Sequence, residues 1–156
     1  MRLDIVTVGR LKQGAPERAL YEDYAERFAR LGARLGLGPL GLREVQSQKA
    51  GQAAELKALE AAIPEGATRI ALDPSGDLIS SENLAALLAQ ERDDGIVGLA
   101  FLIGGADGLG PILKTAPMRI SFGRATWPHL LVRAMLAEQL YRAATILAGH
   151  PYHRGA

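Results

Sequence analysis

The pattern of apolar and polar positions predicts alternating strands and helices. Five short apolar stretches, the second weaker and interrupted by glycine, are typical of strands: residues 3–8, 37–46, 69–72, 97–103 and 118–122. Helical spacing or helix-start residues predict four helices between and after them, over residues 16–31, 50–62, 81–91 and 128–148. Because the strand runs are mostly apolar throughout, we predict an α/β fold with a mostly parallel sheet flanked by helices.

Three loops rich in glycine, proline or small residues follow three of these strands. They are residues 73–76, where Asp-Pro-Ser-Gly predicts that the strand stops in a turn, residues 104–110 and residues 123–128. In parallel sheets, ligands bind beyond the carboxyl ends of the strands. We therefore expect the three loops to form the walls of one pocket.

Composition narrows the class of protein. The 156 residues suit a single domain over 1–156, and the absence of cysteine excludes disulfides, zinc–thiolate sites and a cysteine nucleophile. The sequence has no apolar run of 18 residues, and its N-terminus resembles a strand more than a signal peptide, so we expect a cytoplasmic protein without a membrane span. The net charge of +1 does not indicate nucleic-acid binding, and any RNA contact must come from local patches.

The loop over residues 102–110 contains four glycines but matches neither common nucleotide-binding motif. No Gly-Lys-Ser/Thr follows, and the glycine spacing and late position differ from the dinucleotide fingerprint. The chain therefore lacks the phosphate-binding loop that a nucleotide-dependent hydrolase requires. Two interpretations stay open for Gly104 and Gly105: they let the backbone approach a flat ligand, or they form a tight turn with positive φ.

The last predicted helix is apolar around much of its circumference, which predicts a homodimer interface. On this helix Glu138 and Arg142 are four residues apart. They form either a surface ion pair or an ion network beneath an active site.

The C-terminal segment from His150 to Arg154 combines two imidazoles, a tyrosine and a guanidinium. Such a tail is either disordered or suited to RNA, because tyrosine stacks on bases, histidine moves protons and arginine binds phosphate. A metal site at His150 and His153 lacks an obvious third ligand, so we expect none.

Taken together, four segments resemble the ribosomal RNA large-subunit methyltransferase H family. They are the runs Leu102–Leu109, Trp127–Arg133, Glu138–Ala143 and His150–Arg154, with Gly149 where the family commonly has Asn. The Leu72-Asp73 pair with Gly76 fits as well, and the matching order spans nearly the whole chain. The resemblance implies a SPOUT fold with a C-terminal trefoil knot, a homodimer, S-adenosylmethionine as cofactor, and N3-methylation of a pseudouridine in ribosomal RNA.

The resemblance also implies the cofactor residues, and the chemistry of N3-methylation indicates the catalytic ones. Expected at the catalytic site are His153, Arg154, Arg142, Glu138 and Tyr152. Expected at the cofactor are Leu72, Gly104, Gly105, Gly123, Arg124, Ala125, Thr126, Trp127 and Pro128. His129, beside the cofactor loop, is assigned a structural role. The alternative function is a non-catalytic ribosome- or RNA-binding module on the same scaffold.

Overall fold

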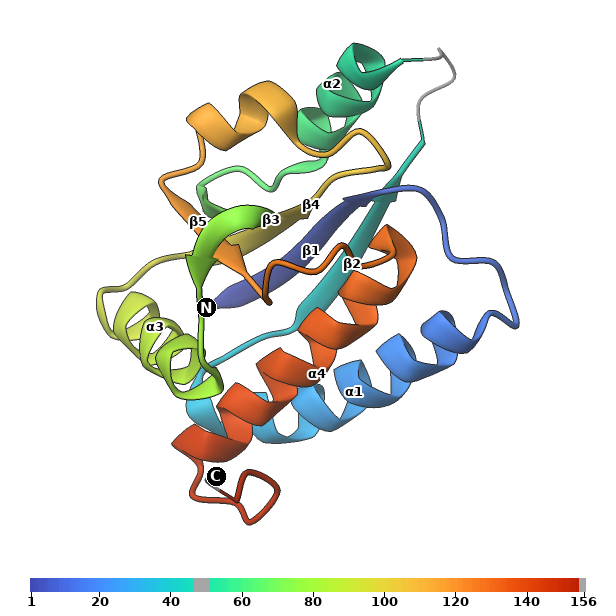
Figure 1. Ribbon diagram of the computed structural model, residues 1–156. Coiled ribbons are helices and arrows are strands. Elements are labelled where there is room, and N and C mark those ends of the chain that lie inside the picture. Colours follow the sequence, from blue (N-terminus) through green and yellow to red (C-terminus); the bar gives the residue numbers. More distant parts are fainter. Residues whose placement is uncertain (47–50, 155–156) are drawn as a thin grey trace.

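A computed structural model describes residues 1–46 and 51–154 and contains a five-stranded sheet (Figure 1). The strands are β1 (Arg2–Val8), β2 (Leu40–Val45), β3 (Ala67–Leu78), β4 (Gly98–Ile103) and β5 (Met118–Ser121). Their order is β2-β1-β4-β3-β5, and every neighbouring pair is parallel. The predicted parallel α/β sheet is therefore confirmed.

Helices cover both faces of the sheet (Figure 1). They are α1 (Pro16–Gly32), α2 (Gln52–Ala62), α3 (Ser81–Asp93) and α4 (His129–Leu147), with short 3₁₀ helices η1 (Ala33–Leu35) and η2 (Gly110–Lys114) that the sequence pattern did not predict. One core cluster joins the sheet to α1, α3 and α4, and a smaller one joins it to α2 and η2. Alternate residues of β4 serve the two clusters, with Phe101 in the first and Leu102 in the second, because successive strand side chains point to opposite faces.

The turn predicted at residues 73–76 is instead an irregularity inside a longer strand. β3 continues to Leu78, and its pairing with β5 shifts register between Leu72 and Asp77. Within this bulge the Asp73 carboxylate accepts hydrogen bonds from the backbone N–H and hydroxyl of Ser75, at 2.9 and 2.6 Å. A Cβ at Gly76 would lie 2.8 Å from the backbone of Ile120, so glycine permits the close approach of the two strands.

Helix α4 packs between α1 and α3 against the sheet (Figure 1). This packing covers much of the apolar circumference from which a dimer interface was predicted, so the helix pattern alone does not demand a partner chain. None of the helices in residues 1–46 and 51–154 has the length and apolar character to cross a membrane. The C-terminal trefoil knot and the single-domain assignment stay predictions.

Candidate functional site

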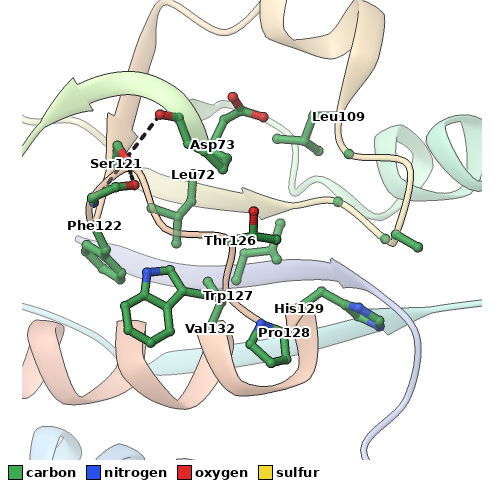
Figure 2. Close-up of a pocket in the computed structure, with 17 residues that line it drawn as sticks. Leu72, Asp73, Leu109, Ser121, Phe122, Thr126, Trp127, Pro128, His129 and Val132 are labelled. Carbon is green, nitrogen blue, oxygen red and sulfur yellow. Dashed lines mark hydrogen bonds between the residues drawn. The ribbon is translucent and has the colours of Figure 1, made fainter.

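The three segments expected to form a pocket do meet: the bulge within β3 and the loops that follow β4 and β5 surround one cavity at the start of α4 (Figure 2). They enclose a cavity of about 470 Å³, within the usual range for small-molecule sites. Most of its wall is apolar, including the side chains of Leu72, Phe122 and Trp127. Asp73, Ser121, Thr126 and His129 provide polar side chains.

Most of the residues expected at the cofactor lie on this wall. They are Leu72, Gly104, Gly105, Gly123, Thr126, Trp127 and Pro128. Arg124 and Ala125 belong to the same loop, but both are exposed and neither lines the cavity. Asp73 and Leu109 also line the cavity and belong to segments that were expected at its wall. Four further wall residues lie outside those segments and were not expected there: Ile103, Ser121, Phe122 and Val132.

The two glycines at the end of β4 do not form a left-handed turn. Neither Gly104 nor Gly105 has a positive φ, whereas Gly108 does, at 71°. A Cβ at Gly104 would lie 2.5 Å from the backbone of Gly108, so the loop folds back on itself at this point. A Cβ at Gly105 would meet Glu55 Oε2 at 3.0 Å and Val8 Cγ1 at 3.2 Å. Close backbone packing therefore explains Gly104 before any ligand is considered, whereas Gly105 packs against two side chains that can shift.

A serine at the end of β5 shapes the opposite wall. The Ser121 hydroxyl donates to the carbonyl of Gly123 at 2.8 Å and accepts from its N–H at 3.2 Å. Gly123 has a φ of 119°, which suits glycine and turns the chain into the loop that leads to α4. Thr126 and Trp127 are thereby placed over the cavity (Figure 2).

His129, the first residue of α4, lines the pocket and packs beside Gly9, where a Cβ would lie 3.5 Å from its Nε2. The pKa of His129 is lowered mainly by partial burial and further by the positive charge of Arg133, while the negative charge of Glu55 raises it. The imidazole is therefore neutral over most of the physiological range.

Arg133, one turn further along α4, is fully buried and joins distant parts of the chain. Its guanidinium donates to the carbonyls of Gly9 and Val8, at 3.0 and 3.2 Å, and to Glu44 Oε1 at 2.8 Å. A buried guanidinium requires such partners, because an unpaired charge in the interior is costly. The buried role of Arg133 could not be read from the sequence, because a lone arginine on a helix does not indicate partners at residues 8, 9 and 44.

The spacing of Glu138 and Arg142 left open a surface pair or a larger network, and the structure contains a network. Oε1 of Glu138 accepts from Nε of Arg142 and from the Tyr152 hydroxyl, both at 3.0 Å. The Arg142 guanidinium lies 4.8 Å from the centroid of the Tyr152 ring, and that ring packs against Tyr141 with centroids 4.8 Å apart. Burial, ahead of hydrogen bonding, raises the pKa of Tyr152, so its hydroxyl remains a donor.

The described part of the tail is folded onto the protein rather than extended into solvent. Nε2 of His153 lies 2.9 Å from Oε1 of Glu82 at the start of α3, and the His150 N–H donates to the carbonyl of Thr145. Arg154 is exposed. Within residues 1–46 and 51–154, no three His, Cys, Asp or Glu side chains are grouped in a way that could bind a metal ion.

One chain does not bring the expected catalytic and cofactor residues together. The pocket contacts the first turn of α4, whereas the tail packs on its second half, and the helix rises about 14 Å from His129 to Glu138. A second hollow of about 620 Å³ lies between the two sites. It shares Ser121, Phe122 and Gly123 with the pocket, continues past Leu131 and Met135, and reaches Glu138.

A parallel α/β sheet with a pocket formed by loops at its carboxyl edge defines a broad class of ligand-binding enzymes, and comparison with known proteins identifies the group within it. Residues 1–153 match the family described as "Predicted SPOUT methyltransferase", and the chain belongs to this family of methyltransferases. It is 54% identical over 156 residues to the ribosomal RNA large subunit methyltransferase H of Ruegeria pomeroyi. The proteins of the same name from Paracoccus denitrificans and Bradyrhizobium sp. (strain ORS 278) are 53% and 49% identical. The matches cover 99% of this chain and 98–99% of each relative.

Proposed function

We propose that this protein methylates large-subunit ribosomal RNA in the cytoplasm, with S-adenosylmethionine as the methyl donor and N3 of a pseudouridine as the acceptor. The observation that carries the proposal is the loop-walled cavity at the carboxyl edge, in a chain that belongs to the SPOUT methyltransferase family. The near full-length similarity to proteins named for ribosomal RNA methylation supports the substrate class.

The cavity fits S-adenosylmethionine in size and chemistry. The apolar side chains of Leu72, Phe122 and Trp127 suit a flat adenine, and the loop that begins at Gly104 forms the wall beside them. The hydroxyl of Thr126 offers a polar contact at the same wall. When bound, the cofactor supplies an electrophilic methyl group on a sulfonium, so the protein's main task is to hold the acceptor in line with it.

The acceptor nitrogen carries a proton that must leave before or during methyl transfer. We assign proton acceptance or orientation of the base to His153, and contact with the RNA and its developing negative charge to Arg154. The hydrogen bonds of Glu138 with Arg142 and Tyr152 support a positioning role for these three residues, since together they hold the tail on α4.

A homodimer would join the two sites that one chain keeps apart. The proposed arrangement places the tail of one subunit at the cofactor pocket of the other. Exposed apolar side chains support a partner surface beside the second hollow: Leu20 and Leu78 line that hollow and are 46% and 68% exposed. Trp127, at the cofactor pocket, is 42% exposed. Burying such side chains in an interface is favourable.

The decisive experiment measures transfer of a labelled methyl group from S-adenosylmethionine to ribosomes that lack the modification, followed by mass spectrometry of the RNA. We expect one methylated pseudouridine in the large-subunit RNA. Cofactor binding without any methyl transfer to ribosomes or free RNA would contradict the proposed methyltransferase activity. RNA binding without cofactor binding would identify the non-catalytic module instead.

Subunit mixing tests the shared site. A chain with Gly105→Arg and a chain truncated after Pro151 should each be inactive alone. Mixed dimers should recover part of the activity, because one of their two pockets combines an intact cofactor wall with an intact tail. No recovery in mixed dimers of demonstrated composition would place both sites within one subunit.

A further inference from the structure

The loop that follows β1 lies beside the cofactor pocket. β1 pairs with β4 so that Thr7 is opposite Ile103, and Ile103 lines the pocket. The side chain of Val8 approaches Gly105, and the next residue, Gly9, packs against the ring of His129. Residues 10–14 therefore leave the sheet at the rim of the cavity, at the same edge as the three loops that form its walls.

A partly buried polar network fixes the course of this loop. The Leu11 N–H donates to Glu44 Oε1 at 2.7 Å, and the Leu11 carbonyl accepts from the Arg18 guanidinium at 2.5 Å. Arg133 binds both Glu44 and the Gly9 carbonyl. Leu11 itself is 3% exposed, so its side chain is anchored in the protein as well.

The residues on either side of Leu11 are cations whose side chains make no polar contact with the described part of the chain. Arg10 and Lys12 are exposed, and within the described ranges neither side chain has an ion pair or a hydrogen bond. The nearby arginines differ, since Arg18 and Arg133 both pair with Glu44. The charged residues that surround the loop are therefore paired with one another, whereas the two cations of the loop itself are presented to solvent.

We propose that Arg10 and Lys12 bind backbone phosphates of the RNA substrate next to the cofactor pocket; this inference rests on the proposed function. A base that approaches the methyl group of the bound cofactor carries phosphates on both sides of its nucleotide, and these phosphates lie near the rim of the pocket. Because the net charge is only +1, attraction to RNA depends on local cations of this kind. A loop held rigid by buried contacts loses little conformational freedom on binding.

Single variants Arg10→Ala and Lys12→Ala test the proposal against Arg34→Ala. Arg34 is also exposed and lies in η1, which precedes β2 and so sits at the opposite edge of the sheet. The double exchange Arg10→Lys with Lys12→Arg keeps both charges and serves as the rescue. Sedimentation with ribosomes measures binding without requiring methylation, calorimetry measures affinity for S-adenosylmethionine, and urea unfolding measures stability.

Each loop variant should weaken ribosome binding roughly 3- to 10-fold near 0.1 M salt and reduce the slope of log affinity against log salt by about 1. The KM for ribosomes should rise with little change in kcat, while cofactor affinity and unfolding stay at wild-type values. Arg34→Ala and the double exchange should bind nearly as the wild type does.

Loop variants that bind ribosomes as well as Arg34→Ala does would overturn the proposal. Reduced affinity for S-adenosylmethionine would assign the loop to the cofactor instead, and would overturn it too. If the unmodified protein binds ribosomes but transfers no methyl group, the proposed function fails, and the sedimentation results still decide the role of the loop.

Discussion

The Tyr152 hydroxyl donates a 3.0 Å hydrogen bond to Glu138, fixing the C-terminal tail to the helix that precedes it. The contact forms within one chain, together with the packing of the Tyr152 ring against Tyr141. The tail therefore has a defined shape before RNA arrives, which lowers the entropy lost when it binds.

Removal of residues 152–156 should abolish methylation while leaving cofactor affinity and dimerisation close to wild type, because the tail does not line the pocket. His153→Ala and Arg154→Ala should each lower turnover, and the arginine variant should depend more strongly on salt because a phosphate contact is screened. Methyl transfer to ribosomes and calorimetry on the same preparations provide the measurements. Full activity without the tail would remove it from the active site.

A bulky side chain at Gly105 should block binding of the cofactor. Alanine at Gly105 would need only small shifts of Glu55 and Val8, whereas arginine must displace them or enter the cavity. Gly105→Arg should lose S-adenosylmethionine affinity by roughly tenfold or more, equivalent to about 1.4 kcal/mol. Gly105→Ala should bind nearly normally. Circular dichroism verifies the fold, and unchanged affinity of a folded arginine variant would show that this wall does not contact the cofactor.

A charge placed beside the second hollow should disrupt the proposed dimer. Leu78 is 68% exposed in the single chain, so Leu78→Lys should not affect the stability of the subunit but should convert dimers to monomers. Val97→Lys is the matched control, since Val97 is 69% exposed and lies outside the hollow. Light scattering at micromolar concentration distinguishes the outcomes. A monomeric wild type would refute the dimer directly.

Protonation of His129 should destabilise the fold. Burial lowers its pKa in the folded protein below the ordinary value of 6.5, so the unfolded chain binds the proton more readily. The contribution of His129 to stability is complete above pH 6.5 and is lost as the pH falls through that value toward the folded pKa. An NMR titration should give a midpoint below 6.5 for its ring, and His129→Gln should reduce the pH dependence of unfolding. A midpoint at or above 6.5 would contradict the burial argument.

Replacing the buried guanidinium should be among the most damaging single changes. Arg133→Met leaves Glu44 with less compensation and the carbonyl of Gly9 without this donor, which should cost about 3 kcal/mol in the free energy of unfolding. The double variant with Glu44→Gln should lose less than the sum of the two single changes, because the two residues interact directly. Urea denaturation of all four proteins measures the coupling. Additive losses would mean that the pair contributes no net interaction.

Local patterns predicted the sheet and the position of the pocket well. Strand runs such as residues 97–103 are apolar on both faces, and that pattern directly reflects a sheet covered on two sides. The pocket followed from the same inference, because parallel strands bring their carboxyl ends to one edge.

Features that depend on contacts distant in sequence were missed. The bulge of β3 arises where Gly76 meets the backbone of Ile120, and local sequence at residues 73–76 is equally compatible with a turn. The burial of Arg133 likewise depends on Val8, Gly9 and Glu44.

The hydrogen bonds from Arg133 to Val8 and Gly9 join the first strand to the last helix, and they have a consequence during protein synthesis. β1 lies between β2 and β4 in the sheet, yet β4 and α4 leave the ribosome long after it does. The nascent N-terminal half thus carries an unpaired strand edge, and Glu44 has Arg18 but not yet Arg133 as its partner, until translation is nearly complete. Such dependence on late contacts favours slow folding after synthesis. We therefore expect chaperones to bind the emerging chain while its strand edge is unpaired.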